Sequence, residues 1–141
     1  MNDRYNLQRF VDAQGGVFRT AIAELRAGRK QSHWMWFVFP QLAGLGRSPT
    51  AQFYGIRSAD EARAYLDHPL LGSRLRQSVE ALKPWAGKRS PEDILGAIDA
   101  LKLRSSMTLF QLAADGPGSV FERVLDRYFG GRLDEATLER T

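Results

Sequence analysis

Apolar residues recur at three- and four-residue steps along most of this chain, which is the spacing that places them on one face of an α-helix. The first such stretch extends from Leu7 to Arg26, and the glycine pair Gly15 and Gly16 predicts a break midway. Gly28 is placed to end this stretch. A second stripe predicts a helix that ends near Pro84 and carries Leu71, Leu75, Val79 and Leu82.

Helix-start signals agree with this pattern. Ser58 stands three residues before Glu61, which is the spacing of a capping box, and it opens a predicted helix that extends to about Asp67. Ser90 precedes Pro91 and two acidic residues, and this combination also indicates the start of a helix. The caps expected for three further helices are Ser32, Ser119 and Asp134.

Three segments are harder to interpret. The helix capped by Ser32 would extend through Phe39, although the aromatic run at residues 34–39 would also suit a buried strand. Residues 43–54 contain two glycines and a proline and predict a turn-rich connection. The helix after Ser90 is expected to carry Ile94, Leu95, Ile98 and Leu101. A separate helix is expected over residues 105–114, before the turn Asp115-Gly-Pro-Gly118.

Together these elements predict an all-α protein. The chain shows no alternating strand pattern of useful length, no repeat at a fixed period and no low-complexity tract. We therefore expect one compact multihelical bundle of seven or eight helices, forming a single domain over residues 1–141. Leu75 and Ile98 are expected in its core, where replacement by alanine would cost about 2 to 5 kcal/mol through cavity formation.

The composition limits the available chemistry. A chain of 141 residues can bury about two thirds of its unfolded surface, so it needs no disulfide or metal to fold. The lack of cysteine excludes zinc–thiolate sites and thiol catalysis, and it fits a reducing cytoplasm. No stretch approaches the roughly 18 apolar residues of a membrane span, so we expect a cytoplasmic location and no membrane partner. The net charge of +4 comes mostly from scattered arginines, which attract anions only weakly.

Residues 28–56 concentrate residue types that an ordinary core does not need. They include two of the three tryptophans and one of the two histidines, whose N–H groups require partners once buried. On a helix starting at Ser32, His33 and Trp36 would face one pocket while Trp34 lies on another face. The alternative is that the tryptophans are packing anchors and His33 is a core or capping residue. This first group consists of Lys30, Ser32, His33, Trp34, Trp36 and Gln41.

A second group of polar residues follows at helical spacing. Asp99 and Lys102 are three residues apart and Lys102 and Ser106 are four apart, so a continuous helix would align them. The alternative is an exposed ion pair followed by a serine cap. If the two groups meet, they combine cations, hydroxyls and an aromatic face, which suit an anionic aromatic ligand such as a nucleotide. The second group consists of Asp99, Lys102, Ser105, Ser106 and Thr108. The expected pocket is built from residues 30–48 and 99–108, and Tyr54, His68 and Arg74 are candidates to join it.

The same motifs resemble a family of uncharacterised bacterial and fungal proteins called domain of unknown function eighteen-ten, some members of which are mislabelled calpastatin. The resemblance extends from Phe10-x-x-Ala13-Gln14 to Thr137-Leu138. Its most specific parts are Gly28-x-Lys30-x-Ser32-His33-Trp34-Met35-Trp36-Phe37-x-Phe39-Pro40-Gln41, Gly44-Leu45-Gly46-x-Ser48, Glu61-Ala62-x-x-Tyr65-Leu66-x-His68-Pro69-x-Leu71-Gly72-x-Arg74-Leu75 and Asp99-x-x-Lys102-x-x-Ser105-Ser106-Met107-Thr108-Leu109-Phe110. It implies a compact multihelical fold and no inhibitory segment. The family has no established reaction to transfer to this chain.

The first functional hypothesis is recognition or hydrolysis of a small phosphorylated or nucleotide-like metabolite. The anion would be held by Lys30, Arg74 or Lys102, and the base would stack on Trp34 or Trp36. A proton would be moved by His33 or Asp99. Further ligand contacts are expected from Ser32, Gln41, Ser105 and Ser106.

Neither a metal nor a cofactor is predicted, because residues 34–67 separate the two histidines and no paired carboxylates stand beside them at helical spacing. The second hypothesis is a non-catalytic protein-interaction module, monomeric or a small homo-oligomer, whose tryptophans and arginines form a hot spot. A deep concave pocket would favour the first hypothesis, and a flat exposed aromatic patch would favour the second. The third hypothesis is weak binding of nucleic acid.

Scattered arginines predict weak, salt-sensitive binding to duplex DNA or RNA without sequence preference. The dissociation constants of such non-specific contacts are about 10⁻⁴ to 10⁻⁶ M at physiological salt. Fluorescence anisotropy with labelled duplexes of two unrelated sequences measures them. Nanomolar binding with a clear preference for one sequence would contradict this expectation.

Overall fold

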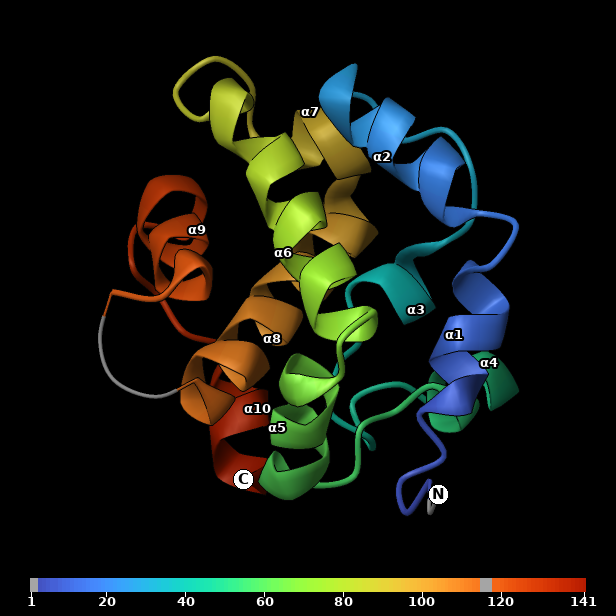
Figure 1. The fold of residues 1–141 in the computed structure, drawn as a ribbon. Coiled ribbons are helices and arrows are strands. Elements are labelled where there is room, and N and C mark those ends of the chain that lie inside the picture. The colour runs from blue at the N-terminus through green and yellow to red at the C-terminus, as the bar shows by residue number, and fades with distance from the viewer. Residues whose placement is uncertain (1–2, 115–117) are drawn as a thin grey trace.

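Helices account for all the regular secondary structure in the computed structural model, which describes residues 3–114 and 118–141 (Figure 1). The first five are α1 (Gln8–Gln14), α2 (Phe18–Arg26), α3 (Met35–Val38), α4 (Pro49–Phe53) and α5 (Ala59–Asp67). The chain continues through α6 (Leu71–Leu82), the 3-10 helix η1 (Lys83–Trp85), α7 (Pro91–Leu95), α8 (Ala97–Ala113), α9 (Val120–Phe129) and α10 (Glu135–Arg140). The all-α prediction is confirmed. Residues 115–117 of the predicted turn lie outside the described residues.

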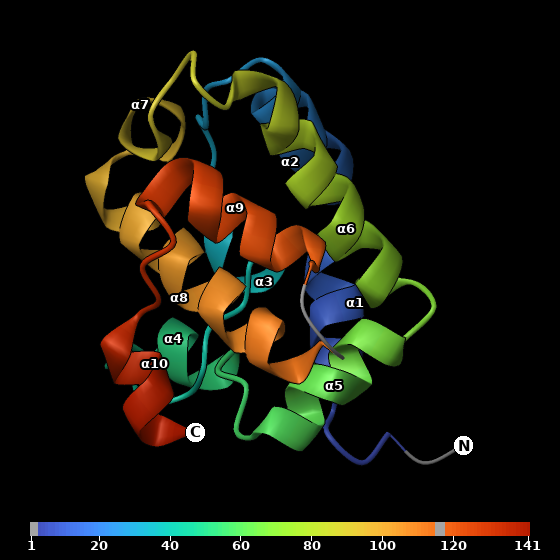
Figure 2. The ribbon, with the colours of Figure 1, turned by 90° about the vertical axis from the view of Figure 1, so that its left-hand side faces the viewer.

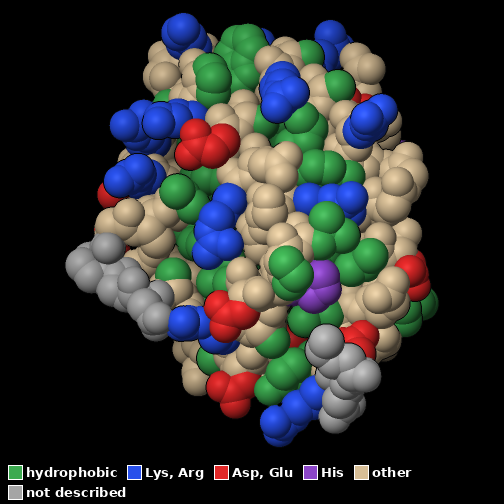
Figure 3. All heavy atoms as spheres, in the orientation of Figure 1, with side chains coloured by type: hydrophobic (Ala, Val, Ile, Leu, Met, Phe, Trp, Pro, Cys, Tyr) green, Lys and Arg blue, Asp and Glu red, His purple; other side chains and the backbone are tan. Residues whose placement is uncertain are grey.

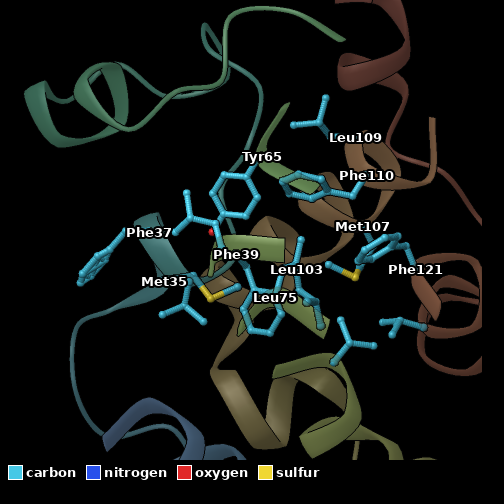
Figure 4. Packing of buried hydrophobic residues seen from close by; sticks show 14 of the residues in the cluster. Met35, Phe37, Phe39, Tyr65, Leu75, Leu103, Met107, Leu109, Phe110 and Phe121 are labelled. Carbon is cyan, nitrogen blue, oxygen red and sulfur yellow. The ribbon is translucent and has the colours of Figure 1, made fainter. Parts of the chain in front are cut away.

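Helix α8 is the element around which the others assemble. α5, α7, α9 and α10 all pack against it, and Figure 2 shows α9 lying alongside it. On α8, the Phe110 ring lies 5.3 Å from the Tyr65 ring of α5 and 5.8 Å from the Phe121 ring of α9 (Figure 4). A second long helix, α6, packs against α2, α3, α5 and α9. These contacts join all the long helices into one hydrophobic core.

Four of the predicted helix caps are confirmed by their hydrogen bonds. Ser90 Oγ accepts from Asp93 N at 3.0 Å and the Asp93 carboxylate accepts from Ser90 N at 3.3 Å, which is a complete capping box. At α5 only half of the predicted box forms: Ser58 Oγ caps the helix, whereas Glu61 accepts from the backbone of Arg57. The other two confirmed caps are Ser119 of α9 and Asp134 of α10.

Ten α-helices occur in the described chain rather than seven or eight, and two local predictions about helix starts are wrong. Ser32 does not cap α3, which begins only at Met35, because the Ser32 hydroxyl is hydrogen-bonded to Glu24 on α2. The connection at residues 43–54 contains α4, for which Ser48 is the cap and Pro49 the first residue. The aromatic run does not form a strand, since residues 35–38 are helical.

The boundary between the last predicted helices also differs. The chain breaks at Gly96, whose φ of +90° favours glycine, and α8 then continues without interruption from residue 97 to 113. Ile98 therefore falls on the solvent side of α8 and is 72% exposed, so its predicted core position is wrong. Leu101 is 62% exposed for the same reason, whereas Leu75 on α6 is 1% exposed and confirmed in the core.

The β-pairing of the described residues is limited to an isolated parallel bridge between Leu42 and Ile56. This bridge holds the start and end of the α4 connection together. In this part of the chain, no helix combines the length and apolar character that a membrane crossing requires.

Alanine replacements at Leu75 and Ile98 should now give different results. Leu75→Ala should lower the free energy of unfolding by about 2 to 5 kcal/mol, because it leaves a cavity in the core. Ile98→Ala should change it by about 0.5 kcal/mol or less, because the side chain is largely in solvent. Urea denaturation followed by circular dichroism measures both values. Equal losses for the two variants would contradict the orientation of α8.

Candidate functional site

The tryptophan-rich segment is held in place by one carboxylate. Glu24 on α2 accepts hydrogen bonds from the backbone N–H of Gln31 at 2.8 Å and of Ser32 at 3.0 Å. It also accepts from Trp34 Nε1 at 2.9 Å and from the Ser32 hydroxyl. Trp34 is consequently only 1% exposed. The polar groups of Ser32 and Trp34 are therefore both satisfied within the protein. For Trp34 this agrees with the alternative stated above, in which the tryptophans are packing anchors.

The same contacts determine the acidity of Glu24. Burial alone would raise the pKa of this carboxyl, but the hydrogen bonds from Ser32, Gln31 and Trp34 stabilise the ionised form and lower the pKa to about 2. Glu24 is therefore ionised throughout the physiological range and serves as a fixed acceptor.

Lys30 and Lys102 share a single carboxylate. Lys30 Nζ lies 3.0 Å from Asp99 Oδ2, and Lys102 Nζ lies 3.2 Å from Asp99 Oδ1. The side chains of Lys30, Asp99 and Lys102 are 9%, 16% and 19% exposed, so this triad is largely removed from water. The backbone N–H of Lys30 donates to the carbonyl of Ile94 at 2.7 Å, which fixes the segment against α7. The triad itself carries one net positive charge.

Both lysines also contact tryptophan rings. Lys102 Nζ is 3.8 Å from the centroid of the Trp36 ring, and Lys30 Nζ is 5.1 Å from that of Trp34, distances at which cation–π attraction is effective. The two groups predicted from the sequence therefore meet. We call Lys30, Trp34, Trp36, Asp99 and Lys102 the lysine–tryptophan cluster.

The turn at residues 44–46 packs beside this cluster. A side chain at Gly46 would place its Cβ 2.7 Å from Cβ of Ala51 and 3.6 Å from the Trp36 ring, so glycine is required for the close approach. Trp36 is thus enclosed on one side by the turn and approached by Lys102.

Three predicted site residues lie outside the cluster. His33 is exposed, and its imidazole makes no hydrogen bond to the described residues. Arg74 on α6 donates to Gln14 Oε1 at 3.3 Å and lies 4.9 Å from the Phe18 ring, so it belongs to the junction of α6 with α1 and α2. The backbone carbonyl of Gln41 accepts from Ile56 N at 2.9 Å in the bridge described above.

The hydroxyl residues of the second group are buried in α8. Ser105 Oγ donates to the Leu101 carbonyl at 3.2 Å, and Thr108 Oγ1 accepts from Asp134 N at 2.9 Å, which ties α10 to α8. Ser106 is fully buried, and its Oγ has no hydrogen-bond partner among the described residues. It follows Lys102 by four residues and so lies on the same face of α8.

Cavities in the surface lie elsewhere. One of about 710 Å³ follows the outer face of α6 and includes Arg26, His68 and Arg76 in its lining. Figure 3 shows the face on which α6 is foremost, where basic side chains are spread out with acidic and apolar ones between them. This cavity and those of about 580, 410 and 390 Å³ take none of their lining from the lysine–tryptophan cluster.

The cluster adjoins an exposed apolar surface. Ile98 and Leu101 are three residues apart on α8, and Ile98 is four residues from Lys102, so the three side chains are neighbours on the helix. We call Ile98, Leu101 and Lys102, together with Trp36 of α3, which contacts Lys102, the α8 face. In the described part of the chain no three acidic or histidine side chains gather closely enough to hold a metal ion.

Comparisons with known proteins agree with this architecture. Residues 4–141 match the family described as "Protein of unknown function (DUF1810)", and the chain belongs to this family. Its structure is similar to the crystal structure at 1.38 Å of the conserved hypothetical protein Rv1873 from Mycobacterium tuberculosis. The two share 52% sequence identity with a TM-score of 0.93, over 97% of this chain and 96% of that one. No curated protein matches the chain.

Replacing Glu24 should test whether it organises the segment. Glu24→Gln should lower the free energy of unfolding at pH 7 by about 1 to 3 kcal/mol, because the amide cannot accept all four hydrogen bonds. The Glu24 pKa is depressed from 4.5 to about 2 on folding, so its contribution is complete above pH 4.5 and is lost as the pH falls toward 2. The difference between parent and variant should therefore shrink across that window.

Denaturant unfolding at pH 7 and pH 3 measures this difference, and Glu80→Gln on the exposed side of α6 provides a matched control. A difference that is equally large at both pH values, or one shared by the control, would contradict the role of Glu24.

Proposed function

We propose that this chain is a non-catalytic binding module that engages a partner protein through the α8 face. The observation that carries the proposal is the exposure of Ile98 and Leu101, at 72% and 62%, on the helix that carries Lys102, which contacts the partly exposed Trp36. Large apolar side chains at the surface, next to a lysine that contacts a tryptophan, have the composition of an interaction hot spot.

The charge of the cluster indicates what the partner needs. Lys102 and Lys30 share one carboxylate, so a partner that covers the α8 face meets a net positive charge at its edge. A segment that combines apolar side chains with an acidic residue would bury Ile98 and Leu101 and pair with Lys102.

Hydrolysis receives little support from the geometry. Both oxygens of Asp99 already accept from ammonium groups, so this carboxylate is not free to take a proton from a water or hydroxyl. His33 has no carboxylate partner among the described residues to orient its imidazole.

Recognition of a small phosphorylated or nucleotide-like ligand on the α8 face is a second candidate. The observation that favours it is the ammonium group of Lys102 at 3.8 Å from the Trp36 ring centroid, because such a ligand needs both a cation and an aromatic surface. The cavities described above lie elsewhere, so this ligand would rest on an open surface.

Site-specific photo-crosslinking tests the primary proposal. We expect p-benzoylphenylalanine in place of Leu101 to give discrete crosslinked adducts in the protein's own cells, and Ile98→Asp to abolish them. The same probe in place of exposed Gln77 on α6 should give none of these adducts. Both positions on α8 are exposed, so the melting temperature should change little.

The two candidates predict different outcomes. Lack of adducts at position 101 would contradict the interaction module. Saturable quenching of tryptophan fluorescence by a nucleotide, lost in Lys102→Gln and retained in Lys88→Gln, would instead support the second candidate.

A further inference from the structure

A cavity of about 390 Å³ opens where the start of the chain, the end of α4 and the start of α5 come together. None of its lining was predicted as a functional site. The residues of the lining that carry chemistry are Arg4, Tyr5, Arg9, Phe53, Arg57 and Glu61.

The floor of this cavity is a buried ion pair. Arg9 Nη2 lies 2.7 Å from Glu61 Oε2, and the two side chains are 6% and 3% exposed. The other hydrogen bonds of Arg9 are donated to backbone carbonyls, at Tyr5 and Asn6 on one side and at Phe53 and Gly55 on the other. The floor is therefore electrically neutral and already hydrogen-bonded, so it shapes the cavity and leaves ligand binding to the rim.

The wall beside the floor is held in an unusual conformation. Asn6 has a φ of +52°, the single positive value at a non-glycine residue in the described chain. In this conformation the backbone carbonyls of Tyr5 and Asn6 both point toward Arg9, whose Nη1 donates to them at 2.6 and 2.8 Å. Asparagine adopts this left-handed conformation more readily than most residues, and the two hydrogen bonds to Arg9 define the shape of the wall.

The rim carries two arginines whose charge is not taken up in an ion pair with any of the described residues. Arg4 and Arg57 are exposed, and neither forms an ion pair with the described residues. The nearest acid in the lining, Glu61, is paired with Arg9 and also accepts from the Arg57 backbone at 3.1 Å. Two guanidinium groups at one opening are suited to an oxyanion, because each can donate two parallel hydrogen bonds.

An exposed aromatic ring stands at the same opening. Phe53 is 53% exposed, although it packs edge-on against Tyr54 with ring centroids 4.8 Å apart. A large apolar ring left half in water, beside two arginines that form no ion pair with the described residues, provides a stacking surface for the flat part of an anionic ligand.

We propose that this cavity binds a phosphate monoester that carries a flat aromatic ring. Arg4 and Arg57 hold the phosphate, the ring stacks on Phe53, and the Arg9–Glu61 pair keeps the floor rigid. This site is separate from the α8 face, and it does not depend on the function proposed for that face.

Titration of ¹⁵N-labelled protein with adenosine 5′-monophosphate, adenosine and inorganic phosphate tests the proposal. We expect the monophosphate to bind tightest and to shift the backbone amides of residues 4–9 and 53–61. Arg57→Gln should weaken binding of the monophosphate about 10- to 100-fold by removing charge-assisted hydrogen bonds. Phe53→Ala should weaken the monophosphate and leave the affinity for inorganic phosphate unchanged.

Arg19→Gln is the matched control, because Arg19 is an exposed arginine on α2 and the variant loses the same charge. Equal weakening by Arg19→Gln would show attraction by net charge only and would overturn the proposal. Millimolar monophosphate that shifts no amide near the cavity would also overturn it. Shifts confined to the indole N–H of Trp36 would overturn it as well and would place the ligand on the α8 face instead. Because Arg57 is exposed and its side chain is unpaired, its variant should keep the parent's melting temperature.

Discussion

The position of the tryptophan-rich segment depends on the carboxylate of Glu24. Residues 29–34 form no regular helix, so their backbone N–H groups need partners from elsewhere. Glu24 supplies these partners for Gln31 and Ser32, and its bond to the Trp34 indole draws that ring into the core. Gly28 lets the ring of Trp85 pack closely against the start of this segment, because a Cβ at position 28 would lie 2.7 Å from that ring. Once the segment is fixed, Lys30 lies at Asp99 and Trp36 lies at Lys102.

Buried polar groups fix the N-terminal helix in a similar way. Gln14 donates to the Phe37 carbonyl at 2.7 Å and to the Tyr65 hydroxyl at 3.1 Å, so one amide connects α1 to α3 and α5. Burial raises the pKa of Tyr65, which therefore remains a neutral hydroxyl despite the nearby cations. An unmatched polar group would be costly at these positions, so such networks specify one arrangement of the helices more than they add to stability.

The sequence predicted helices where their signals are local. Ser58, Ser90, Ser119 and Asp134 were found because a cap is a contact within one turn. The Ser48-Pro49 start of α4 carries the same signal and was hidden by the surrounding glycines. The exposure of Ile98 could not be predicted well, because apolar and polar residues alternate around α8 without a single apolar stripe and periodicity does not show which side faces solvent.

The candidate sites were predictable to different degrees for the same reason. Lys102 and Asp99 share one helix, so their alignment followed from spacing, and the meeting with Lys30 was only a conditional expectation. Glu24 and Arg9 bind residues outside their own helices, such as Trp34 and Gly55. A lone charged residue on a helix gives no local sign that it will be buried by such contacts. Residues of this kind can be recognised only once the fold has brought their partners together.

The two proposed surfaces would bind by different physical routes. On the α8 face Lys102 is already held by Asp99 and the Trp36 ring, so little side-chain freedom remains to be lost when a partner arrives. At the cavity rim neither Arg4 nor Arg57 has an ion-pair partner among the described residues, so both would become more ordered around the proposed ligand, which costs conformational entropy. Attraction there comes mainly from exposed charge, which salt screens, whereas apolar contact with Ile98 and Leu101 is insensitive to screening. Ionic strength therefore separates the two kinds of binding more sharply than affinity does.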